Sequence, residues 1–96
     1  MRVEVTQEDI ASGKKNDCQH CPIARAIARA ATAKFAGRAY VSVFGPARCY
    51  IAPPEKGWKD SIEILLPDNV SRFIQEFDSG AEWTFEPFEF DLDFPS

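Results

Sequence analysis

The strictest pattern in this sequence is an alternation near its C-terminus, over residues 88–94. The even-numbered positions carry three phenylalanines and one leucine, and the odd-numbered positions carry only acidic side chains. Successive side chains of a β-strand point to opposite faces, so one face of this segment is apolar and the other is acidic. Such a strand is covered on one side only. The chain therefore needs helices that pack against this apolar face.

Two longer segments have the features of helices. Residues 68–78 follow Pro67 and carry apolar side chains at helical spacing, which are Val70, Phe73, Ile74 and Phe77. Residues 22–36 are rich in alanine, and Pro22 suits a first helical turn because its missing N–H would have no partner there. A shorter helical turn is expected between its cap, Thr6, and Gly13. We expect residues 68–78 to pack on the apolar face of the last strand.

Four further segments have the composition or alternation of strands: residues 2–5, 39–44, 48–52 and 61–66. The resulting order is β-α-α-β-β-β-α-β. This order predicts an α+β fold, with a mostly antiparallel sheet of about five strands and two main helices packed on one face. The 96 residues are enough for one domain, which we place at residues 1–96.

The Cys-x-x-Cys pair, Cys18 and Cys21, ends directly before the helix that starts at Pro22. The helix dipole favours a thiolate at this position, so the pair suits a redox dithiol or half of a zinc site. Only Cys49 and His20 remain as further metal ligands. The alternative is that the thiols pack as small apolar groups, with Cys49 facing the core. Because the cysteine count is odd and a good fourth ligand is missing, we expect no disulfide, no metal and no cofactor.

Two surfaces are candidates for binding a partner protein. Trp58 lies between Lys56 and Lys59 in a loop that we expect to be exposed, and exposed tryptophans are typical interface anchors. The second surface is the acidic row of the last strand, formed by Glu89, Asp91 and Asp93. An exposed edge strand could also pair with its twin in a homodimer. No catalytic triad or phosphate-binding loop is present, so we expect a non-enzymatic protein with no catalytic residue.

The charges are unevenly distributed along the chain. Residues 1–60 carry ten of the eleven basic side chains, although the net charge of the whole chain is −4. The arginines and lysines at positions 14, 15, 25, 29 and 38 could form a basic patch, which leaves a nucleic-acid-associated regulator as an alternative. The acidic pI of about 4.9 disfavours a nucleic acid partner. Without an apolar leader or a long apolar run, we expect a cytoplasmic protein and no membrane partner.

Three blocks of the sequence, Cys18–Ile27, Leu66–Gly80 and Glu86–Leu92, together with the opening Val3–Thr6, carry a resemblance. They are similar to a family of small, uncharacterised accessory proteins of tailed bacteriophages, especially those that infect actinobacteria. The three blocks cover about a third of the chain. The resemblance implies a non-structural protein that acts in the infected host cell by binding a host protein, for host takeover or counter-defence. It assigns no catalytic residue, and the segment around Trp58 lies outside it.

Overall fold

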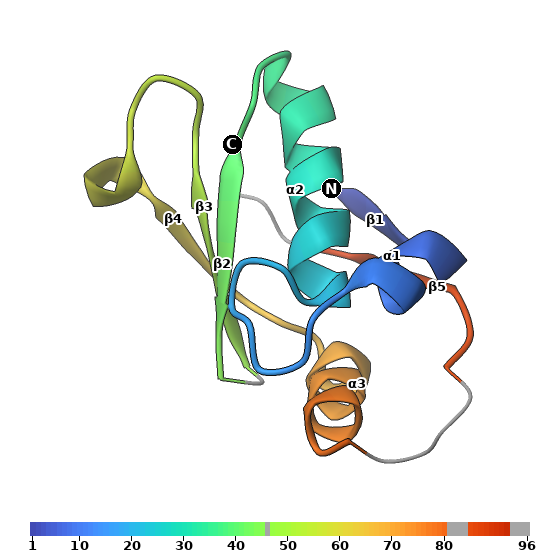
Figure 1. Ribbon diagram of the computed structural model, residues 1–96. Coiled ribbons are helices and arrows are strands. Elements are labelled where there is room, and N and C mark those ends of the chain that lie inside the picture. Colours follow the sequence, from blue (N-terminus) through green and yellow to red (C-terminus); the bar gives the residue numbers. More distant parts are fainter. Residues whose placement is uncertain (46, 81–84, 93–96) are drawn as a thin grey trace.

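The computed structural model describes residues 1–45, 47–80 and 85–92, and Figure 1 shows their arrangement. Three α-helices and five antiparallel strands confirm the predicted α+β class. In chain order the elements are β1 (Arg2–Val5), α1 (Gln7–Ser12), α2 (Pro22–Phe35), β2 (Tyr40–Phe44), β3 (Arg48–Ala52), the 3-10 turn η1 (Trp58–Asp60), β4 (Ile62–Leu65), α3 (Asp68–Asp78) and β5 (Phe88–Asp91). None of the described helices has the length and apolar character that crossing a membrane requires.

The five strands divide between two sheets, whereas the sequence pattern suggested a single one. β1 pairs with β5, and β2, β3 and β4 form a second sheet in that order. In Figure 1, α2 stands between the two sheets, and it contacts both β1 and β2. Its alanines let both layers approach closely, and side chains such as Ala24 and Ile27 are fully buried. One helix therefore serves two sheets, which share a single apolar core.

The three-stranded sheet has two different faces. Its inner face packs against α2 and carries the buried side chains of Val41, Val43, Cys49, Ile51 and Ile64. The opposite face, which we call the outer face, has two cross-strand rows, Phe44–Arg48–Leu65 and Ser42–Tyr50–Glu63. No helix among the described residues covers the outer face in Figure 1. This sheet therefore presents its second side to solvent.

α3 packs against β5 through the apolar side chains that its spacing predicted. The ring centroid of Phe73 lies 5.1 Å from that of Phe88 and 5.8 Å from that of Phe77. Val70 and Ile74 are buried on the same side of the helix. The predicted bounds of α3 are confirmed, and its packing on the last strand is confirmed at the contact of Phe73 with Phe88.

The sheet of β1 and β5 joins two distant parts of the chain. The register places Val3 opposite Phe90, and both side chains are buried. Beyond the strands, the Met1 ammonium group donates a hydrogen bond to the Leu92 carbonyl at 2.8 Å, and the Leu92 N–H donates to the Met1 carbonyl at 2.8 Å. The predicted strand at residues 88–94 is observed as Phe88–Asp91, and its last two positions lie outside the described residues.

Two local details explain where α1 and α2 end. Gly13 caps α1, and a Cβ atom there would come within 2.6 Å of the Asp9 carbonyl and the Pro22 ring, so only glycine fits this close approach. α2 ends at Phe35, one residue before the predicted limit. Ala36 adopts the left-handed conformation with φ 53°, and the backbone then turns into β2. Ala36, the last residue of the predicted helix, is therefore its C-cap.

Candidate functional site

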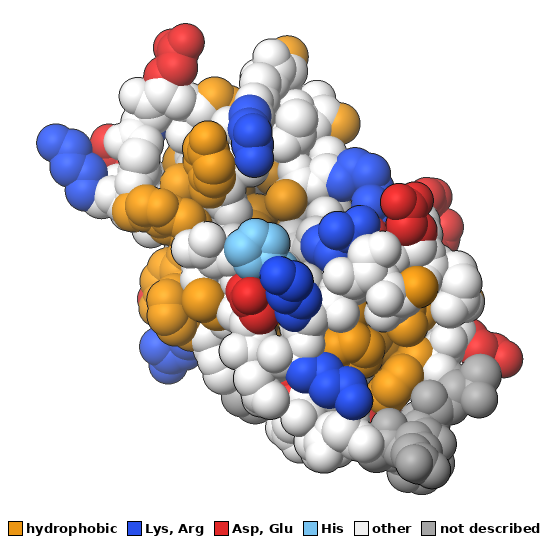
Figure 2. Space-filling model, in the orientation of Figure 1, with side chains coloured by type: hydrophobic (Ala, Val, Ile, Leu, Met, Phe, Trp, Pro, Cys, Tyr) orange, Lys and Arg blue, Asp and Glu red, His pale blue; other side chains and the backbone are white. Residues whose placement is uncertain are grey.

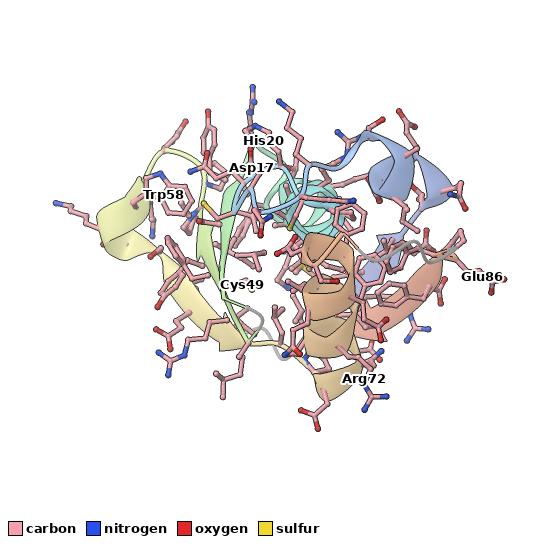
Figure 3. The ribbon with its side chains drawn as sticks, turned by 60° about the horizontal axis from the view of Figure 1, so that its bottom comes forward. Asp17, His20, Cys49, Trp58, Arg72 and Glu86 are labelled. Atoms are coloured by element: carbon pink, nitrogen blue, oxygen red, sulfur yellow. The ribbon has the colours of Figure 1, made fainter. Side chains whose placement is uncertain are left out.

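A cleft of about 480 Å³ opens between α2 and the start of β2, and we call it the arginine cleft. The lining residues with charged or aromatic side chains include Arg25, Arg29, Arg38, His20, Tyr40 and Trp58. They come from the loop before α2, from α2 itself, from the β2 segment and from η1. In Figure 3, His20 and Trp58 lie at the same end of the molecule, and the end of the three-stranded sheet lies between them.

Asp9 forms the base of the arginine cleft. Its side chain is fully buried, and its two carboxylate oxygens accept hydrogen bonds from Arg29 at 3.0 Å and 2.7 Å. The Thr6 N–H donates to the same carboxylate at 2.9 Å, while Thr6 Oγ1 accepts from the Asp9 N–H, which completes a capping box for α1. Burial raises the pKa of Asp9, but the hydrogen bonds from Arg29 and Thr6 outweigh it and hold the pKa below 3.8.

Two other arginines of the cleft keep unused donors. The Arg25 Nε lies 3.5 Å from Asp9 and is buried without a hydrogen-bond partner among the described residues. The Arg38 guanidinium lies over the Tyr40 ring, with 5.3 Å between its Cζ atom and the ring centroid. Asp9 is the acidic residue among the lining residues of this cleft, which include three arginines, while Glu4 and Glu8 act on Arg29 from outside the lining.

A second cavity, of about 450 Å³, lies on the outer face, and we call it the sheet hollow. Phe44 and Tyr50 meet edge to face on one side of it, with ring centroids 5.3 Å apart. Ser42 also lines it, and its hydroxyl is buried without a hydrogen-bond partner among the described residues. Trp58 lines both the sheet hollow and the arginine cleft. The two cavities are therefore neighbours that share the Trp58 side chain.

The large hydrophobic side chains that the described residues expose gather around the outer face. They are Tyr40, Phe44, Trp58 and Leu65, with 52%, 55%, 44% and 68% of their surface accessible. Figure 2 shows hydrophobic side chains gathered on the side of the molecule where this sheet lies, next to the pale blue histidine. The predicted exposure of Trp58, Lys56 and Lys59 is confirmed.

Sequence reasoning missed Phe44 and Leu65 as members of this surface. A signal for Leu65 was present, because it follows the inward-facing Ile64 and so stands at an outward position of its strand. A leucine at such a position is an apolar side chain with no core to enter. The register of β3 against β2 and β4 was also needed, because it places Phe44 and Leu65 in one cross-strand row, on either side of Arg48.

The acidic row of the last strand lies on the other sheet. Arg2 bridges it, with 2.6 Å between Arg2 Nη2 and a Glu89 oxygen and 3.0 Å between Arg2 Nη1 and an Asp91 oxygen. These bonds also lower the pKa of Glu89. Asp93, the third residue of the predicted row, lies outside the described residues. The two predicted partner surfaces are therefore separate, with α2 between the sheets that carry them (Figure 1).

The three cysteines lie in different surroundings, and burial acts more strongly on Cys21 than its hydrogen bonds at the helix start. The Cys21 Sγ accepts a hydrogen bond from the Ala24 N–H at 3.4 Å, but burial raises the pKa of Cys21 above its usual value, so the expected thiolate is not favoured. Burial also raises the pKa of Cys49 to about 12, and Figure 3 shows this residue in the interior. Cys18 is exposed, and all three thiols are free. The packing alternative for Cys21 and Cys49 is thus confirmed.

The described residues hold no cluster of three or more histidine, cysteine or acidic side chains that could bind a metal ion. His20, a candidate ligand, instead has its Nδ1 atom 3.0 Å from an Asp17 carboxylate oxygen. Of the predicted basic patch, Arg25, Arg29 and Arg38 come together in the arginine cleft. The lysines at positions 14 and 15 are exposed in the preceding loop and do not line it.

The chain matches no protein-family model, no curated protein and no solved structure. The resemblance to phage accessory proteins stays a prediction. The outer face, the sheet hollow and the arginine cleft are therefore the features of this protein that indicate a function.

Proposed function

We propose that this protein is a non-enzymatic binding protein that docks a partner protein on its outer face. One observation carries this proposal: the four large hydrophobic side chains most exposed among the described residues surround a sheet face that no described helix covers. Large contiguous apolar patches are rare on soluble monomers and mark interaction sites. Aromatic side chains, which make up three of the four, are enriched at the centres of interfaces.

The sheet hollow gives this surface a place for an anchoring side chain of the partner. Its walls are the rings of Phe44, Tyr50 and Trp58, and the Ser42 hydroxyl is available for a hydrogen bond. Hot spots of protein interfaces are pockets of this kind, filled by an aromatic residue or an arginine. The fitting anchor is an aromatic side chain with a polar tip, such as tyrosine, because the hydroxyl can satisfy Ser42 while the ring contacts the walls.

The charges around the outer face indicate the character of the partner. Lys56 and Lys59 are exposed beside Trp58, and so are Glu55 and Asp60, while Glu63 lies 3.6 Å from Arg48 and is already paired. The charges of the segment around Trp58 therefore balance, and they suit a partner with both acidic and basic groups around its anchor. Such charges speed association at low salt, because they are screened beyond about 8–10 Å at physiological ionic strength. In the setting that the phage resemblance implies, the partner is a host protein.

The composition of the outer face favours a protein over a nucleic acid. Single-stranded nucleic acids bind to exposed aromatic rings set in a continuous basic groove. Here Leu65 is the most exposed large hydrophobic residue among those described, and Glu63 places a carboxylate on the edge strand β4 of the same face. An aliphatic side chain and a carboxylate suit a protein surface better than a phosphate backbone.

Site-specific photo-crosslinking in host cells tests this proposal. A photoreactive amino acid at position 65 should crosslink a discrete partner, and the same group at position 72 should not. Arg72 is the matched control because it is exposed on α3, where it lies beside Phe73 and Phe88 and not on the three-stranded sheet. With the captured partner purified, Trp58→Ala should weaken binding by about 2 kcal/mol or more, as expected of a hot-spot tryptophan. Arg72→Ala should leave the affinity unchanged.

Three outcomes would count against a protein partner at this face. Equal crosslinking from positions 65 and 72 would show that the contact is non-specific. A crosslinked species that nuclease treatment destroys would reassign the face to nucleic acid. A crosslink between two copies of this chain, with a dimer mass by light scattering, would make the homodimer the occupant.

A further inference from the structure

The arginine cleft contains more positive charge than its own carboxylate can neutralise. Asp9 is the acidic residue among its lining residues, and Arg29 already engages both of its oxygens. Neither the Arg25 Nε nor the Arg38 guanidinium has a hydrogen-bond acceptor among the described residues. A guanidinium offers a rigid fork of N–H donors that matches two oxygens of a phosphate or carboxylate. The cleft therefore has the donors of an anion site.

The same cleft also has flat aromatic walls. Tyr40 and Trp58 both line it and are about half exposed, so their rings are accessible to a ligand. The Arg38 guanidinium over the Tyr40 ring places the anion donors directly beside one of these walls. Nucleobases stack on tyrosine and tryptophan rings whatever their identity.

We propose that the arginine cleft binds a nucleoside monophosphate, with the phosphate on Arg25 and Arg38 and the base against Tyr40 and Trp58. The cavity of about 480 Å³ lies in the size range of small-molecule sites. A simple inorganic anion leaves the aromatic walls unused, and an uncharged base leaves the arginines unused. Two sources supply this chemistry: a free nucleotide and the phosphorylated end of a single-stranded oligonucleotide.

The test is an NMR titration of the isotopically labelled protein with adenosine monophosphate, which follows the indole N–H signal of Trp58. Arg25→Ala and Arg38→Ala should each weaken binding by about tenfold or more, as expected for the loss of a charge-assisted hydrogen bond. Arg72→Ala removes an exposed arginine far from the cleft and should leave binding unchanged (Figure 3). Arg38 forms no ion pair with the described residues, so its replacement should keep the fold, which the dispersion of the spectrum reports.

Titrations with the separate parts of the ligand distinguish the contribution of the arginines from that of the aromatic walls. Adenosine and inorganic phosphate should each bind at least about tenfold more weakly than the monophosphate. Tyr40→Ala should weaken the binding of the monophosphate but not the binding of inorganic phosphate. A short oligonucleotide that binds only when it carries a 5′-phosphate would identify the strand end as a source of the ligand, whereas binding of the free nucleotide alone would identify the mononucleotide.

Several results would overturn this assignment. They are the absence of saturable binding up to about 10 mM nucleotide, equal weakening by Arg72→Ala and Arg38→Ala, and equal affinity for inorganic phosphate and the monophosphate. The outer face is tested separately, because crosslinking from position 65 does not depend on Arg25 or Arg38. A failed titration therefore leaves the docking proposal intact, and a failed crosslink leaves the nucleotide site intact.

Discussion

Replacing Asp9 with alanine should destabilise this protein more than any other single change of a charged residue in its described part. The carboxylate is fully buried, where it joins α1 to α2 through Arg29 and closes the capping box with Thr6. Asp9→Ala leaves the Thr6 N–H without its acceptor and removes the carboxylate that Arg25 and Arg29 share, although Arg29 keeps its hydrogen bond to the Glu4 carbonyl. The Arg29 side chain is 51% exposed, however, and can be rehydrated.

The magnitude follows from these contacts. Loss of the charge-assisted hydrogen bond at Thr6 costs about 1.5–2 kcal/mol. The ion pair with the half-exposed Arg29 is screened by solvent, so its loss adds only about 0.5–1 kcal/mol. We therefore expect Asp9→Ala to lower the free energy of unfolding by about 2–3 kcal/mol, below the range of about 3–5 kcal/mol for breaking a fully buried pair. Asp9→Asn keeps an acceptor for Thr6 and should cost about half as much.

The same carboxylate predicts a pH dependence of stability. Because the pKa of Asp9 in the folded protein lies below its ordinary value of 3.8, the folded state favours the charged form. Its contribution is therefore fully present above the unfolded pKa and is lost as the pH falls through the lower, folded pKa. Urea unfolding of the parent and Asp9→Asn should give a constant difference between about pH 5 and 8 that shrinks below about pH 4.

A loss of less than about 0.5 kcal/mol in the free energy of unfolding on Asp9→Ala, the range of ordinary surface substitutions, would contradict the structural role of Asp9. A difference between parent and Asp9→Asn that grows as the pH falls below about 4 would also contradict it. Arg72→Ala is the control for the loss of an exposed charge outside this contact and should lie within about 0.5 kcal/mol of the parent at every pH.

Two further predictions concern the core and the thiols. Phe73→Ala should lower the free energy of unfolding by about 2–3 kcal/mol in urea denaturation. This is less than the cost of truncating a fully buried phenylalanine, because the Phe73 ring is only partly buried. A cost near zero would mean that α3 does not pack on β5 as described. A thiol reagent at pH 8 should modify Cys18 alone in the folded protein, and the other two cysteines only after denaturation, because burial raises the pKa of Cys49 to about 12 and of Cys21 in the same direction. Mass spectrometry that finds two or three modified thiols in the native state would contradict this.

Local structure could be predicted well because its signals are local. The bounds of α3 follow from Pro67 and the apolar spacing behind it, and the start of α2 follows from Pro22. The Thr6 cap and the Gly13 end of α1 could be predicted for the same reason. Each of these features depends on residues within one or two turns of one another, where propensity and capping decide the outcome.

The division into two sheets could not be predicted, because alternation identifies a strand but not its partner. β1 pairs with a strand more than 80 residues away, and nothing in Val3 or Val5 specifies this. The arginine cleft shows the same limit. Arg25 and Arg29 lie one helical turn apart, but their contact with Asp9 depends on how α1 folds back on α2. Cys21 shows another limit of sequence reasoning. The spacing of the cysteines does not indicate burial, and burial raises the pKa of Cys21 although the residue stands at a helix start.

The pairing of β1 with β5 sets an order of events during synthesis. β1 leaves the ribosome before its hydrogen-bonding partner, Phe88–Asp91, which emerges more than 80 residues later. Until then Val3 and Val5 have no strand beside them, and the side of α2 that faces β1 lacks its finished sheet. The three-stranded sheet, built from neighbouring hairpins, can form while translation continues. The binding surface on that sheet can therefore take shape before the molecule has closed.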